Sequence, residues 1–141
     1  MKFLLTLAFA LSAPYIFAQA GPIDFEPNGF GANWAWTTFE NGSNPAVQMV
    51  SNPAPSGINV SGTVCKFTAL VNGAPWAGFE SVHGQGIGVF NLTAANCQIK
   101  VMVYKSVISP VGLKFATPAG ASSGEILVSN TLVDQWEELT F

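Results

Sequence analysis

Charged residues are scarce in this chain, and arginine is missing altogether. Only 9% of its 141 residues are charged, every positive side chain is a lysine, and the formal net charge is −3. Nucleic-acid binders neutralise phosphates with clustered lysine and arginine, and proteins that hold anionic polymers use arginine clamps. The composition therefore argues against nucleic acid as a partner and favours neutral partners.

Cysteine and histidine are scarce as well. The chain has two cysteines, one histidine and no Cys-x-x-Cys pair, which argues against a zinc site. Cys65 and Cys97 each fall on the apolar side of a strand-like run, where a free cysteine behaves as a small hydrophobe. In an exported protein the two could instead form a disulfide, provided that their strands are neighbours. Both alternatives stay open at this point.

A long apolar run occurs only at the N-terminus. Lys2 supplies a positive end, residues 3–17 are largely apolar, and Ala18-Gln19-Ala20 is a small-x-small cleavage site. The run is shorter than the about 20 residues that a membrane span needs. We therefore predict a signal peptide at residues 1–20 and a single domain at 21–141, without a membrane span in the mature chain. The predicted location is secreted, periplasmic or at the cell surface.

The rest of the chain lacks helical periodicity. Short runs with a period of two recur between segments rich in glycine, proline and asparagine, which indicates β-strands separated by turns. This pattern predicts an all-β fold, a β-sandwich of the jelly-roll kind. The last run reaches Phe141 without a turn, so we expect its C-terminal strand to be truncated. The expected strands are 34–40, 46–50, 63–70, 77–82, 88–92, 97–105, 111–116, 124–128 and 136–141.

Three tryptophans lie among glycine, proline, asparagine and threonine, where a buried core would not naturally place them. An exposed indole suits a pyranose ring, because the C–H faces of the sugar are apolar and its hydroxyls need polar partners. The alternative is that these rings cap the core. The three residues are Trp34, Trp36 and Trp76.

Strand alternation predicts which side chains share a face. Trp76 and Glu80 lie on one side of their run if Phe79 is in the core, and Trp34 and Trp36 lie opposite Phe39. Lys100 and Tyr104 likewise lie opposite a row of core valines, and His83 follows in a polar loop. Rings beside groups that bond hydroxyls favour carbohydrate binding. The predicted carbohydrate-binding residues are Trp34, Trp36, Trp76, Glu80, His83 and Tyr104.

Catalytic patterns are weak. Ser81 and His83 share a side of a strand, but no Gly-x-Ser-x-Gly elbow or oxyanion loop accompanies them. Glycoside hydrolysis needs two carboxylates about 5–10 Å apart across the sugar, and nothing in the sequence marks Glu40 and Glu80 as such a pair. We therefore expect a protein that is not an enzyme.

Two acidic residues alternate around an apolar one at Asp24-Phe25-Glu26. Outward carboxylates at the start of a strand often only solvate a sheet edge. They could also supply oxygen ligands to a structural Ca²⁺ ion, which takes carboxylates and backbone carbonyls. The predicted metal ligands are Asp24 and Glu26.

Several short stretches of the chain form a recognisable set. They are Asp24-Phe25-Glu26, Asn52-Pro53 with Ser56-Gly57-Ile58-Asn59-Val60-Ser61, Trp76-Ala77-Gly78, Val101-Met102-Val103-Tyr104 with Val111-Gly112-Leu113-Lys114, and Trp136-Glu137-Glu138-Leu139-Thr140-Phe141. Together they resemble a secreted bacterial jelly-roll module, similar to galactose-binding-like carbohydrate-binding modules of the family 4/9 kind. The resemblance implies non-catalytic binding of a neutral polysaccharide, commonly a β-glucan such as laminarin, beside further domains such as glycoside hydrolases. It also implies a structural Ca²⁺ away from the sugar, with Asp24 and Glu26 matching the start of that site and an aspartate beyond Phe141 completing it.

Two other functions compete with glycan binding. The first is a structural or adhesion domain of a larger surface protein, in which the tryptophans serve the core. The second is a fragment of a glycoside hydrolase, which would release reducing sugar from a glycan.

Overall fold

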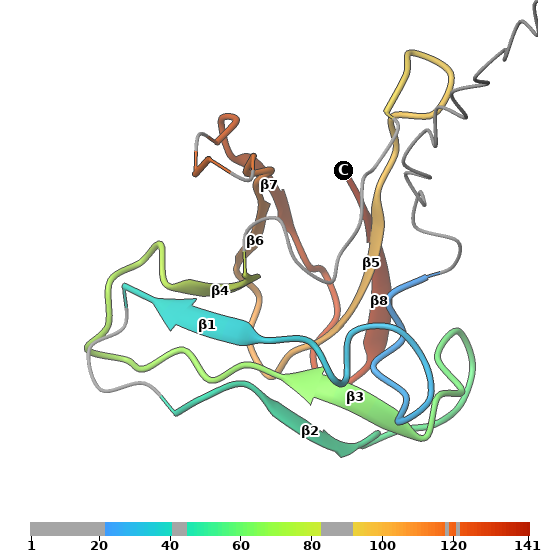
Figure 1. Ribbon diagram of the computed structural model, residues 1–141. Helices are drawn as coiled ribbons and strands as arrows, with labels where there is room; N and C mark the ends of the chain where they lie inside the picture. Colours follow the sequence, from blue (N-terminus) through green and yellow to red (C-terminus); the bar gives the residue numbers. More distant parts are fainter. Residues whose placement is uncertain (1–21, 41–44, 83–91, 118, 121) are drawn as a thin grey trace, which may run out of the picture.

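Short β-strands joined by turns make up the part of the chain that the structure describes. The computed structural model describes residues 22–40, 45–82, 92–117, 119–120 and 122–141, and these residues contain strands and turns without a helix (Figure 1). The predicted all-β class is therefore confirmed. The strands are β1 (Trp36–Phe39), β2 (Gln48–Ser51), β3 (Thr63–Lys66), β4 (Gly78–Ser81), β5 (Lys100–Tyr104), β6 (Pro110–Leu113), β7 (Ile126–Ser129) and β8 (Trp136–Thr140).

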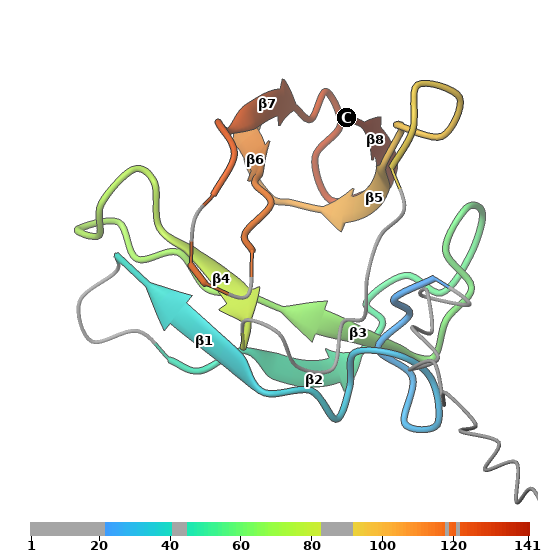
Figure 2. The ribbon, with the colours of Figure 1, turned by 45° about the horizontal axis from the view of Figure 1, so that its top comes forward.

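The strands pair into two-stranded antiparallel ribbons, and the same nesting occurs twice. In the N-terminal half β1 pairs with β4, and the β2–β3 ribbon lies between them in the sequence. In the C-terminal half β5 pairs with β8, and β6–β7 lies between them in the sequence. Figure 2 shows the N-terminal ribbons as a lower layer with the C-terminal ribbons above them. The jelly roll is one way to arrange such strands, and it stays a prediction.

Each observed strand lies where the sequence pattern expects one. The strands are only four or five residues long, shorter than most expected runs. β6 begins at Pro110, which suits a strand end because proline cannot donate to a ladder. The expected strand at residues 88–92 falls almost entirely outside the described residues.

A cluster of half-buried aromatic rings fills the N-terminal half. The indole of Trp36 lies at its centre and donates from Nε1 to the carbonyl oxygen of Gly31 at 2.8 Å. Tilted and edge-on ring contacts of this kind stabilise beyond the area they bury. The ring centroids of Phe25, Trp34 and Phe79 lie 5.7, 5.7 and 5.3 Å from Trp36, and Phe67 lies 5.5 Å from Phe79.

The C-terminal half contains one buried leucine and one buried amide side chain. Leu139 in β8 is 3% exposed and is the one fully buried hydrophobic side chain of the described residues. Asn130, 1% exposed, donates to the carbonyl oxygens of Val107 and Leu132 at 3.0 and 2.7 Å and accepts from the Ser109 N–H at 3.0 Å. A buried amide with its partners supplied satisfies loop backbone groups that no strand ladder reaches.

A hydrogen bond between side chains links the two halves. Trp136 at the start of β8 donates from Nε1 to Oδ1 of Asn52, 3.0 Å away and just beyond β2. Asn52 is itself buried, accepts from the Ala54 N–H at 2.9 Å and donates to the Ser61 carbonyl at 2.9 Å. Trp136 therefore anchors the C-terminal half to a loop that Asn52 already organises.

Glu137 fastens the loop that precedes β8. Its Oε2 atom accepts from the backbone N–H groups of Thr131 and Leu132 at 2.7 and 2.9 Å, and its Oε1 atom accepts from the Thr131 hydroxyl at 2.8 Å. Hydrogen bonds to the charged form, led by those from the Leu132 and Thr131 backbone, lower the pKa of the Glu137 carboxyl.

Candidate functional site

The pairing of β1 with β4 divides their side chains between two faces. Residues directly opposite each other in an antiparallel pair project to the same side of the sheet. Thr38 opposes Phe79, and the rings packed around Trp36 lie on that side. We call it the inner face, and its four side chains are all half-buried: Trp36, Thr38, Phe79 and Ser81.

The other side of the same ribbon, here called the outer face, is open to solvent. Glu80 opposes Thr37 and Phe39 opposes Gly78, and the three side chains other than the glycine are exposed. The outer face thus consists of an aromatic ring, a hydroxyl, a carboxylate and a bare stretch of backbone.

This register corrects the expected arrangement of the rings. We expected Trp36 to share an open face with Glu80 and Phe39 to lie opposite it, but Trp36 opposes Ser81 on the inner face. Phe39 is the residue that shares a face with Glu80. Alternation within one strand cannot reveal this, because a shift of one residue in register exchanges the faces of the two strands relative to each other.

Trp34 belongs to the edge of the inner cluster. It lies in the turn before β1, where its N–H donates to the Gly31 carbonyl at 3.2 Å, and its ring is 5.7 Å from Trp36. Gly31 has a φ of 100°, and a Cβ there would meet Ile23 Cγ2 at 2.7 Å. The turn that positions Trp34 therefore requires glycine.

Trp76 is the exposed tryptophan. The Ala77 N–H donates to the Ala74 carbonyl at 3.0 Å, which closes a turn with Pro75 and Trp76 at its centre. Proline presets the backbone of such a turn. The Ala74 N–H donates to the Glu40 carbonyl at 3.0 Å, so the turn is tied to the end of β1, and the Trp76 side chain is 60% exposed.

The Phe39 ring lies across Gly78, and Phe39 was not among the predicted carbohydrate-binding residues. A Cβ on Gly78 would meet Phe39 Cζ at 2.7 Å and Cε2 at 3.2 Å, so the ring occupies the space that any side chain at position 78 would take. The Phe39 side chain remains 38% exposed. Glycine inside a strand often marks a close approach, and Gly78, two residues after Trp76 in the chain, is the signal that could have identified Phe39.

Two other predicted sugar ligands are not part of this group. His83 lies outside the described residues. Tyr104 in β5 packs edge-on against its cross-strand partner Trp136 at 5.5 Å, and no Cα atom of β5 lies within 8 Å of a Cα atom in β1 or β4. Lys100, at the start of β5, pairs with Glu138 at 2.7 Å, an exposed contact of small energetic value.

The predicted metal ligands both accept backbone hydrogen bonds. Asp24 Oδ1 accepts from the Glu26 N–H at 3.1 Å, and Glu26 Oε1 accepts from the Gly62 and Thr63 N–H groups at 2.6 and 3.1 Å. Across the described part of the chain, no group of three or more histidine, cysteine, aspartate or glutamate residues could hold a metal ion. A calcium site would need backbone carbonyls to complete it, and it stays a prediction.

The two cysteines are free thiols. Burial raises the pKa of the Cys65 thiol, in β3, to about 11, so that thiol stays protonated. Cys97 was expected on the apolar side of a strand, but it is exposed. Mutual backbone hydrogen bonds between Thr93 and Asn96 close a turn before it, and β5 begins only at Lys100.

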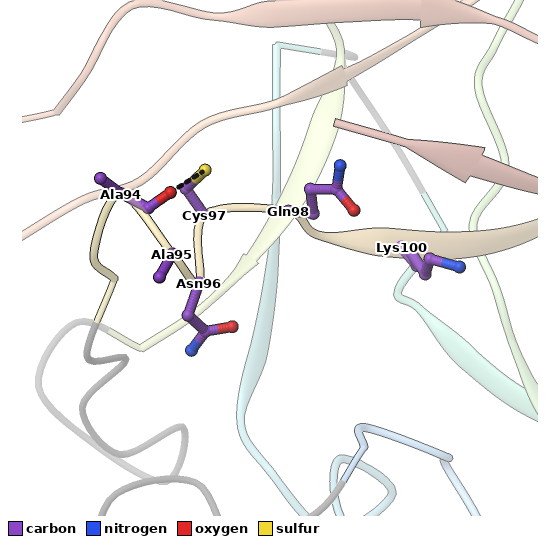
Figure 3. Close-up of a pocket in the computed structure, with 6 residues that line it drawn as sticks. All are labelled: Ala94, Ala95, Asn96, Cys97, Gln98 and Lys100. Atoms are coloured by element: carbon purple, nitrogen blue, oxygen red, sulfur yellow. Dashed lines mark hydrogen bonds between the residues drawn. The ribbon is translucent and has the colours of Figure 1, made fainter.

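A shallow depression surrounds Cys97. In Figure 3 the Cys97 thiol points back toward the Ala94 carbonyl, with Sγ and O 3.7 Å apart. The walls carry alanines, two amides, the thiol and one lysine, without a base placed beside the thiol. The lining residues are Ala94, Ala95, Asn96, Cys97, Gln98 and Lys100.

A lysine and a serine meet in the loop after β5. Lys105 Nζ donates to Ser109 Oγ at 2.7 Å and to the Ser109 carbonyl at 2.6 Å, and burial lowers the pKa of Lys105. A Ser–Lys pair can act in acyl transfer only with donors for the oxyanion. The Ser109 N–H already bonds Asn130, so we interpret this pair as a clamp on the loop.

Comparisons with protein-family models, with curated proteins and with solved structures found no match for this chain. Nothing among the described residues forms a helix long and apolar enough to span a membrane. The two faces of the β1–β4 ribbon are therefore the features of this molecule that bear on its function.

Proposed function

We propose that this protein binds a neutral polysaccharide without cleaving it, on the outer face of the β1–β4 ribbon. One observation carries the proposal: Trp76, 60% exposed, sits on a hydrogen-bonded turn beside a face that holds Phe39 and Glu80. An exposed indole close to a second exposed ring and a carboxylate offers a ligand both an apolar surface and a hydrogen-bond acceptor.

The chemistry of the face suits a sugar. The aromatic rings offer flat apolar surfaces for the C–H faces of a pyranose. The Glu80 carboxylate has several lone pairs that can accept from sugar hydroxyls, and the Thr37 hydroxyl can donate or accept. The outer face as defined carries no lysine, so it offers nothing to an anionic polymer and a neutral chain fits it best.

The same inventory supports binding without hydrolysis. A glycosidase needs two carboxylates flanking the scissile bond, and Glu80 is the one carboxylate among the paired residues of the outer face. An open face also leaves the sugar hydroxyls in competition with water. We therefore expect weak binding, with a Kd on the order of micromolar to millimolar.

The remaining expectations fit this proposal. The signal peptide predicted at residues 1–20 would export the protein to where polysaccharides occur. The resemblance to family 4/9-like carbohydrate-binding modules, drawn from short sequence stretches, points to the same class of ligand. Of the predicted sugar ligands, the proposal retains Trp76 and Glu80 and adds Phe39.

Calorimetry and affinity electrophoresis on a panel of neutral glycans test the proposal. Trp76→Ala is expected to weaken binding by about tenfold, because removing one stacked ring forfeits on the order of 1–2 kcal/mol. Val71→Ala is the control, since Val71 is fully exposed on the same loop. Undiminished binding by the Trp76 variant, or no binding of any glycan by the native protein, would contradict the proposal.

A further inference from the structure

We propose that Phe39 is a second stacking ring, seated on Gly78, and that the site therefore recognises at least two consecutive sugar residues of a chain. This inference rests on the proposed function and deepens it. It assigns a ligand length and a role to two residues, Phe39 and Gly78, that tryptophan positions alone do not suggest.

The seat on Gly78 holds the Phe39 ring in place. Three ring atoms, Cζ, Cε2 and Cε1, would lie 2.7, 3.2 and 3.4 Å from a Cβ on Gly78. Since several ring carbons approach the same point above the backbone, the ring covers the glycine. A ring supported by backbone on one side and 38% exposed is preorganised for a flat ligand, which lowers the entropic cost of binding.

Trp76 and Phe39 serve neighbouring positions. Trp76 is two residues from Gly78, so their Cα atoms are at most about 7 Å apart. The turn that carries Trp76 is bonded to the carbonyl of Glu40, the residue after Phe39. Both rings are thus attached to the same end of the β1–β4 ribbon, and the proposal assigns one sugar residue of the chain to each ring.

A purely structural role for Phe39 makes a different prediction. A cross-strand aromatic ring over a glycine also stabilises the ribbon itself. In that case replacing Phe39 would lower stability without changing how affinity depends on ligand length. Chain-length dependence therefore separates a stacking ring from a ring that only packs.

The experiment compares glucose with β-1,3- and β-1,4-linked disaccharides and tetrasaccharides by calorimetry, using the full chain. For the native protein, affinity should rise by about tenfold from one sugar to two. Phe39→Leu keeps apolar bulk without a flat ring and should abolish this gain. Phe39→Tyr keeps the ring and should retain it.

Gly78→Ala tests the seat and serves where Phe39→Leu fails to fold. It leaves every other sugar-contacting group in place but displaces the Phe39 ring, so the gain with chain length should again disappear. Gly112→Ala is the matched control in β6, because a Cβ there meets only the flexible end of the Glu125 side chain. Phe30→Ala removes a ring of similar exposure, 41%, outside the ribbon, and should change nothing.

The outcomes distinguish the two proposals. If Phe39→Leu or Gly78→Ala keeps the full gain while Trp76→Ala loses binding, the second ring is refuted and glycan binding stands. If the native protein binds no member of the panel, both proposals fall together. Loss of the gain in both variants, with Phe39→Tyr retaining it, supports the second ring.

Discussion

The two halves of this molecule share one topology and use different chemistry to hold it. In each half, the first strand pairs with the fourth and the second pairs with the third. The N-terminal half packs half-buried rings around Trp36, whereas the C-terminal half relies on Leu139 and on the amide of Asn130. The nesting of strands thus does not dictate what fills the space between them.

The difference has a functional consequence. A ribbon can pack rings on one face and display rings on the other, because successive side chains of a strand point to opposite faces. The β1–β4 ribbon does this, with Trp36 on the inner face and Phe39 on the outer face. In the C-terminal half Tyr104 instead packs against Trp136, whose indole donates a hydrogen bond to Asn52, which suits a structural role.

The largest expected difference in stability is between variants of Trp36 and Trp76, two tryptophans of the N-terminal half. Trp36→Ala should lower the free energy of unfolding by about 3 kcal/mol, because it removes a half-buried ring at the centre of the cluster. Trp76→Ala should change it by less than about 0.5 kcal/mol, since its ring is exposed. Chemical denaturation of both variants measures the contrast. Equal losses would mean that the two faces do not differ.

In the C-terminal half the corresponding test is Asn130→Ala. The change leaves one N–H and two carbonyl groups of the surrounding loops without their hydrogen-bond partner. It should lower the free energy of unfolding by about 2 kcal/mol. Asn130→Asp keeps the acceptor for Ser109 and loses both donated bonds, so it should also destabilise. Thermal unfolding with both variants measures this. Native-like stability of Asn130→Ala would show that the loops hold without the amide.

A smaller effect is expected from acid, and it too is specific to the C-terminal half. Because the folded-state pKa of Glu137 is lowered, its contribution to stability is present above the usual glutamate pKa of about 4.3 and is lost as the pH falls through the lowered value. The protection of the Thr131 and Leu132 amides against hydrogen exchange, measured relative to the intrinsic exchange rate at each pH, should therefore fall in acid. Glu137→Gln should have low protection at every pH, and a persistent fall in acid in that variant would locate its cause elsewhere.

The smallest perturbation compares one thiol from each half. Cys65 has its pKa raised to about 11 by burial, so at neutral pH it is a protonated thiol and should react slowly, whereas Cys97 is exposed. A thiol reagent should titrate one group in the native protein and two after unfolding. If no thiol reacts in the native or in the unfolded protein when reductant is absent, the two cysteines form a disulfide instead.

Strand positions were predictable because their signals are local. Alternation over 100–104 and the Trp136-Glu137-Glu138-Leu139-Thr140 run located β5 and β8, and Gly, Pro and Asn clusters marked the turns. Cys97 was misplaced because the Thr93–Asn96 turn shortens that strand. The outward orientation of Glu80 was also foreseeable, since it follows from alternation around one core residue, Phe79, whereas Trp76 lies in the turn before that strand.

The sequence by itself thus determined the all-β class, the approximate strands and the supply of rings and carboxylates, since each depends on neighbours in the chain. Only the tertiary structure decided that Trp36 faces inward and Phe39 outward. That choice depends on which residue of β4 opposes which residue of β1. Register between strands 42 residues apart (Trp36 to Gly78) leaves no local trace, and a slip of one residue would reverse the two faces.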